Sequence, residues 1–170
     1  SEGYIARRSY ESIYGLSIAD STGAYGQIYE YTVLGQIRST KAIGIEGKPI
    51  LLNDGVYERK TKYDNRGNPI EETTHNKKGK LILKQELYAR LTLEYDSNGN
   101  EIKMSFFDIN ENLTLTASGY AFIVSKYDER GDWIEASQLD TNGEPILSSE
   151  GFARYSSKYD ERGNLIEQSF

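Results

Sequence analysis

Residues 119–150 have the sequence GYAFIVSKYDERGDWIEASQLDTNGEPILSSE, and this pattern recurs along the chain. The tyrosine before the first turn recurs most regularly. It stands at Tyr31, Tyr63, Tyr95, Tyr127 and Tyr159, each 32 residues after the previous one, and a glycine follows each of them by four residues. Several marker positions do not recur five times in one phase by chance. The chain is therefore a tandem repeat protein.

Four full repeats cover residues 23–54, 55–86, 87–118 and 119–150, and a partial repeat covers 151–170. Residues 1–22 fit the pattern least well. We expect this first stretch to be a degenerate first repeat or an N-terminal cap, because terminal repeats of such arrays are often atypical. Residues 23–170 then form the repeat array.

Each repeat begins with a segment whose side chains alternate. In the third repeat Leu91 and Leu93 share one side, while Thr92 and Glu94 share the other. A period of two with apolar residues on one side is typical of a half-buried strand. The next four residues follow the pattern Asp-x-x-Gly, as in residues 128–131, and predict a type I turn closed by a glycine bulge.

A second strand follows this turn, and a Gly-Pro return such as Gly143–Pro145 leads to a short third segment. The fold class is therefore all-β. We expect tandem β-hairpin repeats of 32 residues that form an elongated antiparallel sheet or spiral. A β-solenoid is the alternative, although tight hairpin turns favour antiparallel neighbours.

The turn motif Y-D-x-x-G-N occurs in residues 63–68 and 159–164. It resembles the YD repeats of bacterial RHS-type proteins. The whole repeat, G-Y-A…Y-D-E-R-G-N…D-x-N-G-x-P, also resembles tyrosine-rich β-hairpin repeats of large bacterial proteins. RHS-type shells enclose toxin domains, so the resemblance implies a bacterial protein with a structural role.

Composition limits the function classes. The formal net charge is -6, which argues against nucleic-acid binding, because such binding depends on lysine and arginine at phosphates. The chain has no cysteine, which excludes disulfides and thiolate chemistry. No apolar run predicts a membrane span. The compartment stays open, with an extracellular or cell-surface location favoured over a cytoplasmic one.

The recurring tyrosines are either a stacking platform for sugars or core residues whose hydroxyls reach a turn or water. Tyr10, Tyr14 and Tyr29 break the pattern, so we predict them as binding residues. Trp133 is the single tryptophan, and we predict it as an anchor in a binding surface. It is equally consistent with an ordinary strand residue beside a turn. No pattern predicts a catalytic residue, a metal site or a cofactor, and the single histidine, His75, is not preserved by the repeat.

These features predict a non-catalytic repeat module that presents an extended surface to a protein or glycan partner. One alternative is a structural subunit or segment of a self-assembling filament or shell, whose partners are further copies of itself. The other is an enzyme with an unrecognised site.

Overall fold

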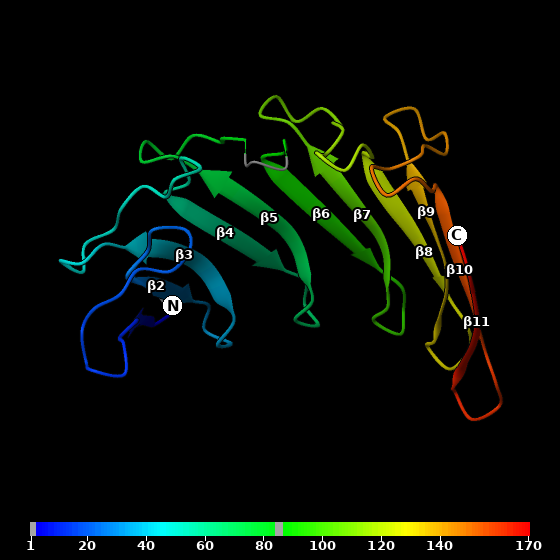
Figure 1. The fold of residues 1–170 in the computed structure, drawn as a ribbon, viewed down its shortest axis with the longest axis horizontal. Helices are drawn as coiled ribbons and strands as arrows, with labels where there is room; N and C mark the ends of the chain where they lie inside the picture. The colour runs from blue at the N-terminus through cyan, green and yellow to red at the C-terminus, as the bar shows by residue number, and fades with distance from the viewer. Residues whose placement is uncertain (1–2, 84–86) are drawn as a thin grey trace. The chain divides into compact units, whose positions relative to one another are not determined.

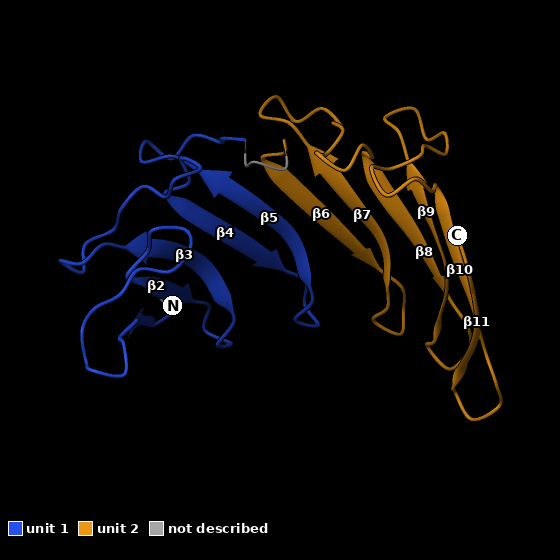
Figure 2. Cartoon of the chain, in the orientation of Figure 1, with its two compact units in different colours: residues 1–84 blue, residues 85–170 orange. Residues whose placement is uncertain are grey.

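A computed structural model describes residues 3–83 and 87–170. The described chain is all-β and forms eleven strands (Figure 1). They are β1 (Ile5–Ser9), β2 (Gly26–Tyr31), β3 (Ile37–Ile43), β4 (Glu58–Tyr63), β5 (Pro69–His75), β6 (Arg90–Tyr95), β7 (Glu101–Phe107), β8 (Phe122–Tyr127), β9 (Trp133–Leu139), β10 (Arg154–Tyr159) and β11 (Leu165–Ser169). The chain divides into two compact units, Ser1–Lys84 (unit 1) and Gln85–Phe170 (unit 2) (Figure 2).

Each unit contains an antiparallel meander in which strands adjacent in sequence pair with one another. The order is β1 to β5 in unit 1 and β6 to β11 in unit 2. The predicted antiparallel hairpins are therefore confirmed. The alternative of a β-solenoid is wrong, because its repeats would pair equivalent strands in parallel.

The first turn of each repeat has the predicted geometry. In the hairpin of β8 and β9, the amide of Asp128 donates to the carbonyl of Asp132 at 3.0 Å, and the amide of Gly131 donates to the carbonyl of Asp128 at 3.0 Å. Gly131 has φ +86°, a conformation that glycine adopts without steric cost. The register shifts between Lys126 and Tyr127, as a glycine bulge requires.

The aspartate of the turn makes stability dependent on pH. The carboxylate of Asp128 accepts backbone amides of Asp132 and Arg130, both at 2.9 Å. The bond from Asp132 is the main cause that lowers the pKa of Asp128 below its ordinary value of 3.8. Amides of Glu144 and Asn112 lower the pKa values of Asp140 and Asp108 in the same way.

We expect acid to destabilise the fold through these turns. A carboxyl group with a lowered pKa contributes stability that is present above its unfolded pKa and is lost as the pH falls through its folded pKa. The urea midpoint should therefore stay nearly constant around about pH 6 and fall progressively towards about pH 3. Asp128→Asn should have a weaker acid dependence than the parent chain. A midpoint that is flat over this range would contradict the assignment.

The second turn leads to a return segment that folds back along the second strand. The amide of Ile146 donates to the carbonyl of Gln138 at 3.0 Å. Thr114 makes the equivalent bond one repeat earlier, and Ile82 makes it two repeats earlier. Only single bridges form, such as Leu139 with Pro145, so the predicted short third strand is reduced to one residue. Leu87 and Glu111 stand at repeat positions that are glycine in most other repeats, and both have a positive φ of 67°.

Glu111→Gly should stabilise the chain by about 0.5 to 1 kcal/mol. A left-handed backbone costs a non-glycine residue about 1 to 2 kcal/mol, and the greater freedom of glycine in the unfolded chain offsets part of that gain. Urea unfolding followed by circular dichroism measures the difference. The matched control is Glu129→Gly, an exposed turn glutamate that is not among the residues with positive φ. The interpretation fails if both variants are destabilised equally.

Residues 5–17 have the geometry of the second half of a repeat, although their sequence barely shows it. Glu11 bridges Ser17, as Ile43 bridges Pro49 one period later. Gly15 has φ +73° in the slot that Gly47 occupies with the same angle. The backbone conformation is therefore retained where the side-chain pattern is not.

Fully buried side chains are few and mostly small. Buried apolar residues include Ala24, Ala89 and Ala121, with exposed fractions of 1%, 0% and 0%. The recurring tyrosines are only half-buried, and their hydroxyls link successive repeats. The hydroxyl of Tyr127 donates to the carbonyl of Glu101 at 3.0 Å. Tyr63 makes the same bond to Ile37 at 2.8 Å, and Tyr159 makes it to Trp133 at 3.0 Å.

Tyr127→Phe should destabilise the chain by about 1 kcal/mol. The variant removes the donor and leaves the carbonyl of Glu101 without this partner, while the ring stays in place. Chemical unfolding measures the loss. Tyr14→Phe is the control, because the side chain of Tyr14 is 82% exposed, and it should change nothing. Equal effects in the two variants would show that the hydroxyl does not link the repeats.

One face of each meander carries ion pairs between opposite positions of paired strands. The Nζ atom of Lys126 lies 2.9 Å from Glu135, and that of Lys62 lies 2.7 Å from Glu71. Alternation then directs the intervening residues, such as Ser125 and Ala136, to the opposite face. The hollows described below open on that opposite face.

Candidate functional site

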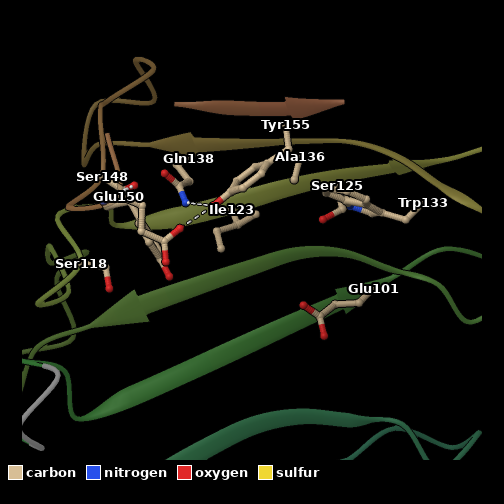
Figure 3. A pocket seen from close by; sticks show the side chains of 11 residues that line it. Glu101, Ser118, Ile123, Ser125, Trp133, Ala136, Gln138, Ser148, Glu150 and Tyr155 are labelled. Atoms are coloured by element: carbon tan, nitrogen blue, oxygen red, sulfur yellow. Dashed lines mark hydrogen bonds between the residues drawn. The ribbon is translucent and has the colours of Figure 1, made fainter. Parts of the chain in front are cut away.

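Trp133 lies at the edge of a hollow of about 300 Å³ in unit 2 (Figure 3). Strands β7 to β10 and the turns at the ends of the repeats contribute its lining residues. The lining residues are Glu101, Ser118, Tyr120, Ile123, Ser125, Trp133, Ala136, Gln138, Ser148, Glu150 and Tyr155. Three aromatic side chains, five hydroxyl groups (two of them on tyrosines), one amide and two carboxyl groups are therefore gathered in one concave surface.

A chain of hydrogen bonds crosses the hollow (Figure 3). The Nε2 atom of Gln138 donates to the hydroxyl of Tyr155 at 2.8 Å, and that hydroxyl donates to Oε2 of Glu150 at 3.2 Å. Gln138 is 3% exposed, and its Oε1 atom has no hydrogen-bond partner among the described residues. The hollow thus contains a buried acceptor that the protein itself does not use.

The two carboxyl groups have no cationic partner within the described part of the chain. Burial raises the pKa of Glu101 above its ordinary value of 4.5. Burial also raises the pKa of Tyr155, and the charge of Glu150 adds to the rise. Both shifts mark a partly desolvated, electronegative environment.

Aromatic contacts hold the rings of the hollow in place. The rings of Trp133 and Tyr155 have centroids 6.0 Å apart and are tilted by 58°. Phe152 packs edge-on against Tyr155, with centroids 4.2 Å apart. The ring of Tyr120 lies 5.8 Å from that of Phe106, which is 5% exposed. Packing on both sides restricts these rings before any ligand arrives.

Unit 1 contains a hollow of about 400 Å³ at the equivalent place, three periods earlier in the sequence. Its lining residues are Asp20, Thr22, Ala24, Gln27, Thr40, Ala42, Leu52, Val56, Tyr57 and Arg59. Arg59 occupies the repeat position of Tyr155, and Ala42 occupies that of Gln138. Ile37 occupies the position of Trp133, but it does not line the hollow of unit 1. The repeat therefore builds the hollow, and the residues that do not recur determine its chemistry.

The three predicted tyrosines belong to unit 1, whereas Trp133 belongs to unit 2. Tyr10 is half-buried beside Arg8, whose guanidinium lies 5.6 Å from the ring centroid. Tyr29 is half-buried, and its hydroxyl donates to Gln27, which lines the hollow of unit 1. Tyr14 is 82% exposed in a turn. Of the four predicted residues, Trp133 alone is among the lining residues of these two hollows.

No candidate metal site emerges from residues 3–83 and 87–170. These residues contain no group of three or more His, Asp or Glu side chains that could hold a metal ion. His75 is half-buried, and burial lowers its pKa, with a further decrease from the charge of Lys60. No described helix is long and apolar enough to cross a membrane.

Sequence reasoning missed Gln138, Tyr155, Glu101 and Glu150. One pattern could have revealed them, since each departs from most other repeats at its position. Gln138 replaces Ala42, Thr74 and Phe106, for example. A search for polar and aromatic residues that break the repeat would have found these positions together with Trp133.

No family model and no curated protein matches the sequence. Among solved structures, the chain is similar to a Photorhabdus luminescens Tc holotoxin pore, with 19% identity, a TM-score of 0.45 and coverage of 90% of this chain. It is also similar to TcdB2-TccC3 without its hypervariable C-terminal region, with 19% identity, a TM-score of 0.44 and coverage of 96%. The chain spans 9% of the length of each of these proteins.

Proposed function

We propose that this chain is a non-catalytic repeat module that binds a glycan in the hollow of unit 2. The supporting observation is that aromatic rings and hydrogen-bonding groups lie side by side in that hollow. A sugar ring has an apolar face that packs on an aromatic ring and hydroxyl groups that need donors and acceptors. Trp133 provides such a ring, and Ser125 and Gln138 provide polar groups beside it.

The shape of the site favours a ring-sized ligand over a large protein surface. Small-ligand sites are concave, enclose about 300 to 1,000 Å³ and contain a few well-placed polar groups. The hollow of about 300 Å³ falls at the lower end of this range. A protein partner, which the sequence left open, is the less suitable occupant.

The single tryptophan makes the proposal directly testable. Because Trp133 is the only tryptophan, a change in intrinsic fluorescence reports on this hollow. Titration of the full chain with neutral oligosaccharides should shift the emission, and calorimetry should give the matching affinity. The proposal would be overturned if no oligosaccharide produced either signal up to about millimolar concentration.

The absence of catalysis is tested in the same samples. We expect every bound oligosaccharide to be recovered intact after prolonged incubation. Glycoside hydrolysis needs two carboxyl groups placed on either side of the scissile bond, one of them with a raised pKa. Cleavage that disappears in Glu101→Gln would therefore overturn the non-catalytic part of the proposal.

A further inference from the structure

The hollow of unit 2 is electronegative and lacks its own counter-charge. Glu101 and Glu150 contribute two carboxyl groups, and no lysine, arginine or histidine is among the eleven lining residues. Glu101 is half-buried, and an unpaired carboxylate there is unfavourable, because burial removes water without supplying a partner. Glu150 is exposed and adds a second negative charge. A positively charged ligand would supply that partner.

A second, independent feature requires a hydrogen-bond donor. Gln138 is 3% exposed, and its amide nitrogen donates to the hydroxyl of Tyr155 at 2.8 Å. Its Oε1 atom remains without a partner among the described residues. A buried carbonyl oxygen that lacks a donor costs free energy, which a donor from a ligand would recover.

The aromatic rings also favour a positively charged ligand. Trp133, Tyr120 and Tyr155 all line the hollow, and the faces of aromatic rings attract cations. An ammonium group has three donors, which suits the carboxylate of Glu150 and the amide oxygen of Gln138 at one end of the hollow. The hydroxyl groups of Ser118 and Ser125 then suit the polyol part of the same molecule.

We propose that the hollow of unit 2 prefers a sugar that carries a positively charged amine to the N-acetylated or neutral form of the same sugar. This inference rests on the proposed function, since it names the chemical class of that ligand. The ammonium group lies at the end of the hollow where Glu150, Tyr155 and Gln138 meet (Figure 3). The carboxyl group of Glu101, at the other end beside Trp133, adds to the negative potential of the hollow. N-acetylation removes both its charge and two of its donors.

The hollow of unit 1 serves as an internal comparison. It has the same scaffold, but Arg59 stands in the position of Tyr155 and Ala42 in that of Gln138. A guanidinium in the lining repels an ammonium group, and the unpartnered amide is missing. Amine preference is therefore a property of the residues that differ between the two hollows.

The test uses the full chain and three tetrasaccharides: a glucosamine oligomer, its N-acetylated counterpart and a glucose oligomer. Trp133 fluorescence and calorimetry follow binding at a pH where the amine is protonated. We expect the glucosamine oligomer to bind about tenfold more tightly than the other two. Oligolysine of similar length is included to distinguish a sugar site from a site for basic peptides.

Paired charge variants identify the source of the preference. Glu101→Gln combined with Glu150→Gln should abolish the tenfold difference between the glucosamine oligomer and the other two oligomers. The matched control is Glu129→Gln combined with Glu161→Gln, which removes the same charge from exposed turns of the same unit. Tyr155→Arg copies unit 1 and should abolish amine preference, and circular dichroism verifies that each variant is folded.

The outcomes separate this inference from the proposed function. Equal affinity for the amine and its N-acetylated counterpart would overturn the inference and leave glycan binding intact. Preference that survives in the double variant of Glu101 and Glu150 would also overturn it. If only oligolysine binds, the sugar assignment fails, and if no probe binds, both proposals fail.

Discussion

Replacing Ile43 by alanine is expected to lower the free energy of unfolding by about 2 to 4 kcal/mol. Ile43 is 1% exposed and is among the largest fully buried side chains of the described residues. It ends β3 opposite Gly26, and its carbonyl accepts the amide of Tyr25 at 2.8 Å. Because Gly26 has no side chain, no neighbouring strand residue fills the space that the substitution leaves.

Urea unfolding followed by circular dichroism measures this loss, and two variants set its scale. Ile43→Val removes one methylene group and should cost about 0.5 to 1.5 kcal/mol. Val33→Ala truncates a side chain that is 61% exposed and should change stability by less than about 0.5 kcal/mol. A cost for Ile43→Ala no greater than that for Val33→Ala would show that burial at this position contributes little.

Replacing Trp133 by alanine is expected to weaken glycan binding at least about thirtyfold. Buried aromatic anchors contribute about 2 kcal/mol or more to binding, which corresponds to this factor. The contact of Trp133 with Tyr155 is lost together with the ring. The bond from the hydroxyl of Tyr159 is retained, because its acceptor is the backbone carbonyl of residue 133. The fold should therefore survive the substitution.

Calorimetry is the appropriate measurement, since the variant contains no tryptophan. The matched control is Ile37→Ala, which changes the same repeat position in unit 1, where the carbonyl accepts the hydroxyl of Tyr63. The control should bind with the affinity of the parent chain. Unchanged affinity in Trp133→Ala would place the glycan site elsewhere.

The turns and hairpins follow from neighbouring residues, and for that reason the sequence predicts them well. In the turn of residues 128–131, Asp128 accepts the amides ahead of it and Gly131 takes positive φ at no cost. Both effects act within five residues. The sequence also left a β-solenoid open as an alternative. The tight turns exclude it, because they make neighbouring strands antiparallel.

Burial was less predictable than local geometry. Strand alternation suggested that the recurring tyrosines form a core, yet Tyr127 is half-buried and its hydroxyl reaches back to Glu101 in the preceding repeat. Small residues such as Ala89 and Ala121 are fully buried instead. Strand periodicity does not predict which positions are enclosed this tightly.

The sequence by itself determined the period of 32 residues and the antiparallel hairpins, and it singled out residues that do not recur, including Trp133, as candidates for binding. Only the tertiary structure decided which of these residues share a site. Glu101, Trp133 and Tyr155 come from three successive repeats, and pairing of β7 to β10 brings them together. The same packing removes water from Glu101 and raises its pKa. The reason is physical: hydrogen bonding in a turn acts between neighbours, whereas burial depends on everything that lies nearby in space.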